Sequence, residues 1–271
     1  MSPSMPPHMP LTPYHIGPHP SDDTIIWKYF KRPYFESLIN DSALFFRRVI
    51  DFVTDDPNEG TIPQRDQQRD RLLALSRPHP TISSLVSAVT VANGIDGWGM
   101  RHATVINCWT MRPTESRMMW IAYAGIGDGT SRGIAIRSTV GMLKKALEGQ
   151  PEEVNMSSVR YIDYENDVFE DGTGNAMTPI LHKSVHGYSD EQEFRLIHRH
   201  SMTEPFQKEN LWSEYPGCRA TKIKVNLSNL LCEVVMSPNA TDDDLNTAQA
   251  LCASKGVSNA TTLFRHSHMH Q

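Results

Sequence analysis

The stretch that decides the fold runs from residue 188 to residue 198 and reads Tyr-Ser-Asp-Glu-Gln-Glu-Phe-Arg-Leu-Ile-His. From residue 191 onward its side chains alternate, which is the period of a β-strand with two different faces. One face carries Glu191, Glu193 and Arg195, and the other carries Gln192, Phe194 and Leu196. The stretch therefore predicts a strand with a charged face and a mostly apolar face.

Shorter strand and helix signals surround this strand on both sides along the chain. Further strands are expected at 25–30, 42–46, 105–110, 134–136, 159–164, 221–227 and 231–236. Helices are expected at 33–39 and 118–124, from the N-cap candidates Ser138 and Thr139 to residue 149, and from Thr241 to residue 256. Residues 52–71 form a long polar loop that passes into a helix. Because strands and helices mix without a regular βαβ alternation, we expect an α+β fold: a single domain with a largely antiparallel mixed sheet and flanking helices.

The domain limits follow from composition. Residues 1–23 are rich in Pro, Met and His and show no amphipathic period, so we expect a disordered leader. A single catalytic domain is expected at 24–264. Residues 265–271 are rich in histidine and are expected to form a flexible tail.

Composition also limits the class of protein. The chain has 271 residues, 39% of them hydrophobic, and a formal net charge of -5, which excludes fibrous and wholly disordered proteins. No apolar run is long enough to span a membrane and no secretion signal is recognisable, so we expect a cytoplasmic protein. Its four cysteines form no CxxC pair, which favours reduced thiols over disulfides or a zinc site. We expect neither a metal nor a cofactor, since the glycine-rich segment 125–133 lacks the strand and helix that a dinucleotide loop requires.

The acidic residues at the start of the deciding stretch are the first candidates for chemistry. Asp190, Glu191 and Glu193 lie within four residues of one another. Their mutual repulsion is expected to raise the pKa of at least one, which suits a general base. Arg195 could hold one carboxylate ionised or bind an anionic substrate group. The alternative is an exposed ladder of charges on an antiparallel sheet.

A second candidate cluster lies between the expected strand at 105–110 and the expected helix at 118–124. It contains Glu115, Ser116, Trp120 and Tyr123, together with Cys108. Cys108 could be a nucleophile if its pKa were lowered, or an inert packing residue. Glu115 and Ser116 could contact substrate or cap the helix that bears Trp120.

Taken in order, short motifs along the chain resemble a large domain-of-unknown-function family of bacteria and fungi. They are Trp27-x-Tyr29, Leu44-Phe45-Phe46-Arg47, Asp56-Pro57-Asn58-Glu59-Gly60, Cys108-Trp109, Glu115-Ser116, Met119-Trp120 with Tyr123, Gly133-Ile134-Ala135-Ile136 with Ser138-Thr139, Val159-x-Tyr161, Lys183 and Glu191-x-Glu193-x-Arg195. The resemblance covers residues 24–264. Within the family, the pattern is similar to the fungal arginine-containing cyclodipeptide synthases, whose acidic motif Asp-Asp-x-x-Glu matches Asp190 and Glu193 and departs at Ser189.

This resemblance implies an enzyme of secondary metabolism that joins two aminoacyl-tRNAs, one of them arginyl-tRNA, into a diketopiperazine. The aminoacyl ester is already activated, so neither ATP nor a metal is implied. Glu193 would be the general base, and Asp190 or Glu191 would pair with the substrate guanidinium. If an acyl-enzyme forms, Ser116, Ser138 or Cys108 could carry it.

The resemblance also implies binding roles around these groups. Tyr123 and Tyr161 would orient the ester carbonyl. The tRNA phosphates would require a cationic patch such as Lys28, Lys31 and Arg32. Two alternatives remain: an ADP-ribosyltransferase-like enzyme that uses NAD, in which Glu191 or Glu193 stays important, and a non-catalytic binding module with an acidic surface strand.

Overall fold

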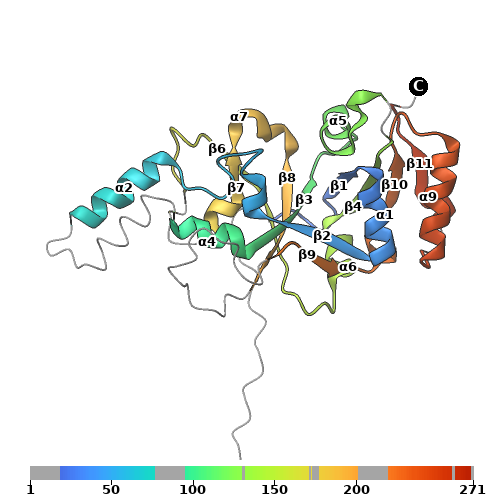
Figure 1. Ribbon diagram of the computed structural model, residues 1–271, viewed down its shortest axis with the longest axis horizontal. Helices are drawn as coiled ribbons and strands as arrows, with labels where there is room; N and C mark the ends of the chain where they lie inside the picture. Colours follow the sequence, from blue (N-terminus) through green and yellow to red (C-terminus); the bar gives the residue numbers. More distant parts are fainter. Residues whose placement is uncertain are drawn as a thin grey trace, which may run out of the picture.

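The computed structural model describes residues 19–76, 95–129, 132–170, 172, 177–200, 219–257 and 260–269. Within them lies a nine-stranded, mostly antiparallel sheet with helices packed against it (Figure 1). The expected α+β architecture is therefore confirmed. Most of the expected leader lies outside the described residues. Residues 21–24, however, form a turn, and the Asp22 carbonyl accepts a hydrogen bond from Gly141 N at 2.8 Å, so contacts with the domain begin before residue 24.

The large sheet has the strand order β11-β10-β4-β1-β3-β2-β9, with β8 paired to β3 and β5 paired to β8. Only β10 and β11 run parallel in it. Its strands are β1 (Ile25–Phe30), β2 (Ala43–Arg48), β3 (Thr104–Thr110), β4 (Ile134–Thr139), β5 (Asn155–Ser158), β8 (Glu193–Arg199), β9 (Thr221–Lys224), β10 (Glu233–Met236) and β11 (Phe264–His266). A separate two-stranded parallel ribbon contains β6 (Arg160–Ile162) and β7 (His182–Ser184).

Helices and short 3-10 turns connect these strands. The helices are α1 (Arg32–Asp41), α2 (Gln64–Leu75), α4 (Ile95–Ala103), α5 (Arg117–Ala124), α6 (Val140–Leu147), α7 (Val185–Tyr188), α8 (Leu227–Leu230), α9 (Asp242–Ser254) and α10 (Ala260–Leu263). The 3-10 turns are η1 (Val49–Phe52), η2 (Ile126–Asp128), η3 (Thr178–Leu181) and η4 (Ser189–Glu191). No helix of the described ranges combines the length and the apolar character that crossing a membrane requires.

The two faces of the sheet bury different side chains. Along β1, Ile26 and Phe30 belong to the main core, which α1, α6, α8 and α9 cover. Trp27 and Tyr29 alternate with them and pack on the opposite face against Trp120 of α5. This is the period-2 pattern of a strand that is buried on both sides.

Three strands, β1, β2 and β8, pair with the central strand β3, and the sheet divides at this strand. β8 pairs with β3 along its whole length, from Thr104↔Arg199 to Thr110↔Glu193. Since a strand has only two edges, β2 and β1 must share the other edge, and they pair with β3 only near its two ends. The gap between β1 and β2 along this edge of β3 forms a seam. There Lys28 Nζ donates to the Cys108 carbonyl at 2.7 Å. Figure 1 accordingly shows β1, β4, β10 and β11 together at one end of the molecule and β6, β7 and β8 toward the other.

Helix ends follow the expected local signals. Thr139 caps α6 by accepting from Met142 N, and Ser138 does not. At α9, Thr241 and Asp244 form a reciprocal capping box. The expected strand at 221–227 ends at Lys224, and Leu227 begins α8 instead, because Asn226 accepts from Asn229 N as an N-cap.

The expected flexible tail at 265–271 is wrong for its first residues. Phe264–His266 forms β11 beside β10, and Ser267 is buried. The histidine-rich composition suggested disorder, but the strand completes the sheet edge and its polar groups find partners on Glu115.

Candidate active site around Arg195

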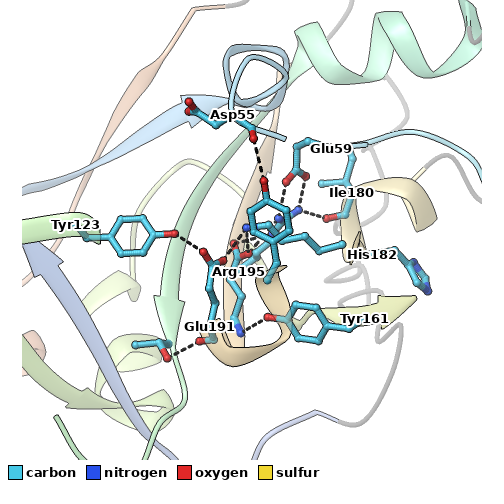
Figure 2. A network of polar contacts seen from close by, with 12 residues as sticks. Asp55, Glu59, Tyr123, Tyr161, Ile180, His182, Glu191 and Arg195 are labelled. Atoms are coloured by element: carbon cyan, nitrogen blue, oxygen red, sulfur yellow. Dashed lines mark hydrogen bonds and ion pairs between the residues drawn. The ribbon is translucent and has the colours of Figure 1, made fainter. Parts of the chain in front are cut away.

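A buried guanidinium lies at the centre of the site. Arg195 is 1% exposed, and its Nη1 and Nη2 donate to the two oxygens of Glu59 at 2.6 and 2.8 Å. Nε and Nη2 donate to the two oxygens of Glu193 at 2.8 and 3.1 Å. Nη1 also donates to the Ile180 carbonyl at 2.5 Å. All the N–H groups of the guanidinium are therefore used, as Figure 2 shows.

The local fold brings Glu59 to this guanidinium. Glu59 lies in a tight turn after η1, in which Glu59 N donates to the Asp56 carbonyl at 3.0 Å. Gly60 follows with φ +67°, and a Cβ placed there would lie 2.8 Å from Cγ of Arg101. Glycine at position 60 thus allows both the backbone turn and the close approach of Arg101.

A second cation extends the network toward solvent. Lys183 Nζ donates to Glu191 Oε2 at 2.6 Å, lies 3.5 Å from Glu193 Oε2, and is 4.2 Å from the ring centroid of Tyr188. Tyr123 donates its hydroxyl to Glu191 Oε1 at 2.6 Å. Glu191 is thus the carboxylate at the outer edge of the network, with 19% of its side chain exposed against 5% for Glu193.

Glu191 lies on a turn and not on the strand, which corrects the expected register. β8 begins at Glu193, because Gln192 adopts a left-handed conformation with φ 44° and ends the turn η4. The end of β3 holds this turn: Thr110 donates to the Glu191 carbonyl, Met111 N to that of Gln192, and Arg112 to that of Asp190. The side chain of Asp190 is exposed, away from the buried network.

Repulsion within the acidic cluster was expected to raise the pKa of at least one carboxylate, but the pKa of Glu193 is lowered. Burial opposes its ionisation, but the charges of Arg195 and Lys183 outweigh burial and lower the pKa of Glu193 to about 2. Two cations therefore override the repulsion between carboxylates: Arg195, which the sequence places on the same strand face as Glu193, and Lys183, which it does not. Glu193 is a permanently charged partner of Arg195 near neutral pH.

The other network groups respond to the same charges. Burial raises the pKa of Glu59 despite its forked pairing with Arg195. Burial also raises the pKa of Tyr123, and the Glu191 charge raises it further. For Lys183, burial opposes the charged form, but Glu193 and Glu191 together raise its pKa. Lys183 is accordingly an ammonium group and Tyr123 a neutral hydroxyl donor.

Tyr161 joins the network through the main chain. Its hydroxyl accepts from Glu193 N at 2.8 Å, and β6 carries it beside Lys183 on β7. Tyr161 also lines an open cavity of about 670 Å³, with Arg65, Arg160, Asp167 and His182 among its other lining residues. Tyr161 thus contributes both to the ion network and to the wall of that cavity.

The second candidate cluster is divided between structural contacts and the network, and its Glu115 binds the C-terminal segment. Glu115 accepts from Arg265 Nη1 at 2.7 Å and from Ser267 Oγ at 2.5 Å. Ser116 is the N-cap of α5, and Trp120 is fully buried against Tyr29. These three residues were expected to bind substrate, but the members of the cluster that reach the network are Tyr123, through Glu191, and Cys108, whose thiol hydrogen-bonds to the Glu193 carboxylate.

The other two candidate nucleophiles, Ser138 and Cys108, lie in surroundings that do not activate them. Ser138 is 1% exposed and donates to the Leu230 carbonyl at 2.7 Å on the main-core side of β4. Burial raises the pKa of Cys108 well above its usual range, and the Glu193 charge raises it further, so its thiol is not activated.

The expected cationic patch does not form as a unit. Lys28 occupies the seam between β1 and β2, where burial lowers its pKa to about 8. Arg32 pairs with Glu36 at 2.9 Å and with Asp244 at 2.7 Å. Only Lys31 of the three is exposed at the surface.

Sequence reasoning missed Glu59, Lys183 and Tyr188 as members of the site. Glu59 and Lys183 were present in the motif series, but no spacing rule connects residues so far apart in sequence with Arg195. Among the described residues, no group of three or more His, Cys, Asp or Glu side chains is arranged to hold a metal ion.

Comparisons with known proteins return no relative: no protein-family model, no curated protein and no solved structure matches this chain. The resemblance stated from the motifs therefore stays a prediction.

Proposed function

We propose that this chain is an aminoacyl-tRNA-dependent cyclodipeptide synthase that condenses an arginyl group with a second aminoacyl group. The observation that carries the proposal is the position of Glu191. This carboxylate is partly exposed, and the Tyr123 hydroxyl and the Lys183 ammonium hold it at 2.6 Å each. Glu59 and Glu193, by contrast, are bound to Arg195 and buried.

Glu191 takes the role of proton acceptor in this proposal. The α-ammonium group of one aminoacyl ester loses a proton to Glu191, and its nitrogen attacks the ester carbonyl of the other. The carbon–oxygen ester bond breaks, and the tRNA hydroxyl leaves with a proton. A second attack of the same kind closes the six-membered ring and releases the second tRNA.

Lys183 and Tyr123 supply the complementary charge and hydrogen bond. An oxyanion develops on the ester carbonyl during each attack, and preorganised donors stabilise such charge. Lys183 stays protonated because Glu193 and Glu191 raise its pKa. Glu193, with its lowered pKa, is a positioning residue that holds Lys183 and Arg195.

The test is to express the full chain in a bacterial host and search the extract for arginine-containing diketopiperazines by mass spectrometry. Glu191→Gln should remove the product. Glu148→Gln, an exposed glutamate just after α6, is the matched control and should keep it. Well-folded protein that yields no such product but turns over NAD would contradict the proposal.

A further inference from the structure

One buried carboxylate beside the site has an oxygen with no partner. Asp56 is 4% exposed, and its Oδ1 accepts from Asn58 N at 3.0 Å. Its Oδ2 is buried and has no hydrogen-bond partner in the described part of the chain. Leaving a charged oxygen desolvated and unpaired is costly, so such an atom points to a cationic partner that is not part of the protein.

Asp56 lies next to the ion network. It opens the turn that delivers Glu59 to Arg195, through the hydrogen bond from Glu59 N to the Asp56 carbonyl. Burial raises the pKa of Tyr188, and the Asp56 charge raises it further; burial and the Glu59 charge raise that of Tyr164, and the Asp56 charge adds to them. The Tyr188 hydroxyl donates to the carbonyl of Asp55, so the chain at Asp55 and Asp56 lies beside Tyr188. Figure 2 shows the preceding residue, Asp55, on the same side of Arg195 as Glu59.

Tyr188 covers this side of the network and is held by few contacts. Its hydroxyl donates to the Asp55 carbonyl at 2.8 Å, and its ring lies over Lys183. Gly187 before it has φ +89°, and nothing lies within 4 Å of a Cβ placed there. His186 is also non-helical, so α7 is kinked directly before Tyr188. Rotation about this kink would move the ring without disturbing the core.

We propose that Asp56 is the specificity residue for the cationic side chain of the substrate, which enters past Tyr188 when this residue rotates about the kink. A guanidinium matches a carboxylate through forked hydrogen bonds, and an uncharged side chain of the same shape would leave Asp56 unpaired. This inference rests on the proposed function for the identity of the cation, the arginyl group. It assigns that group to Asp56 and leaves Glu191 for the α-amine.

The decisive variant is Asp56→Asn, which keeps an oxygen for Asn58 N and replaces only the charge. Its matched control is Asp55→Asn, the neighbouring residue, whose side chain is 72% exposed. The probes are L-arginine methyl ester and L-citrulline methyl ester, which differ in the charge of the side-chain group, and binding to the full chain is measured by calorimetry. Neither probe requires turnover.

Wild type and Asp55→Asn should bind the arginine ester about tenfold or more tighter than the citrulline ester, and Asp56→Asn should bind the two alike. The unfolding midpoint of Asp56→Asn should be no lower than that of wild type. This result shows that the variant keeps the fold. A wild type without preference, or an Asp56→Asn variant that keeps the preference, overturns the inference.

A second variant tests the entry route. Tyr188→Phe keeps Asp56 and loses the hydroxyl that bonds to Asp55, so it should bind both esters a few-fold tighter and keep the preference for the arginine ester. Weaker or unchanged binding of the arginine ester would contradict entry past Tyr188. These results separate the two proposals: if no diketopiperazine forms but the preference depends on Asp56, only the proposed function fails.

Discussion

Glu191 and Glu193 are two residues apart in sequence but have different surroundings. Glu193 receives two hydrogen bonds from Arg195 and is buried, whereas Glu191 lies at the edge with Tyr123 and Lys183. Charge alone therefore does not distinguish the two carboxylates. The number of fixed cations around each one does.

Glu191→Gln should lower the rate of product formation by about 100-fold or more, because it removes the proposed proton acceptor. It should leave the unfolding midpoint nearly unchanged, since the side chain is partly exposed. Steady-state kinetics and a thermal melt of the same preparation check both parts. A variant with unchanged turnover would remove Glu191 from the mechanism.

Arg195→Lys should reduce the free energy of unfolding by about 2 to 4 kcal/mol, because lysine cannot make the forked pairs and leaves Glu59 and Glu193 poorly compensated. Urea unfolding measures this loss. The exposed Arg117, replaced in the same way, is the control and should behave as wild type. A loss equal to that of the control would show that the buried network contributes little.

At the scale of elements, the site is assembled by loops that fasten to β3 and β8. The turn after η1 brings Glu59, the β6–β7 ribbon brings Lys183 and Tyr161, and η4 brings Glu191. Backbone hydrogen bonds fix the position of each of these segments, and the spacing of side chains in the sequence does not reveal such bonds.

Gly60→Ala should displace the Glu59 turn and lower both stability and product formation. The new Cβ would need φ +67° and would lie 2.8 Å from Cγ of Arg101. Gly149→Ala is the control, since its φ is +77° but nothing lies within 4 Å. The control should lose only about 1 kcal/mol of its free energy of unfolding, which is the cost of a left-handed backbone at alanine. Gly60→Ala should lose clearly more. Equal losses in urea unfolding would argue against a steric role for Gly60.

Glu115→Gln should loosen the C-terminal strand. Glu115 accepts from Arg265 and Ser267, and these hydrogen bonds join β11 to the start of α5. Hydrogen exchange of the amides of residues 264–268 should become faster in this variant, while that of β8 stays slow. Unchanged exchange at β11 would show that pairing with β10 alone holds the strand.

For the whole molecule, the sequence predicted the fold class and most strands, because period-2 patterns and helix caps such as Thr241 are local signals. It could not predict every partner of this network: Glu59 is far from Arg195 in sequence, and Lys183, which lowers the pKa of Glu193 together with Arg195, lies on another ribbon. The same limit explains why Glu115 and Ser138 looked like site residues. Their polar side chains are satisfied by distant segments, the C-terminal strand and the Leu230 carbonyl.

The lowered pKa of Glu193 makes global stability sensitive to acid. Its pKa is about 2 in the folded protein, against an ordinary value of 4.5. The stabilisation it provides is therefore present above pH 4.5 and is lost as the pH falls from 4.5 toward 2. Urea unfolding across this pH range should show that the free energy of unfolding falls more steeply for wild type than for Glu193→Gln. Parallel curves for the two proteins would contradict the assigned pairing.

The most direct test of the central claim uses purified protein, arginyl-tRNA and a mixture of other aminoacyl-tRNAs, with products followed over time by mass spectrometry. The account predicts an arginine-containing diketopiperazine with wild type and with Glu148→Gln, and none above background with Glu191→Gln. A diketopiperazine formed equally by the Glu191 variant, or no diketopiperazine from folded wild-type protein, would contradict it.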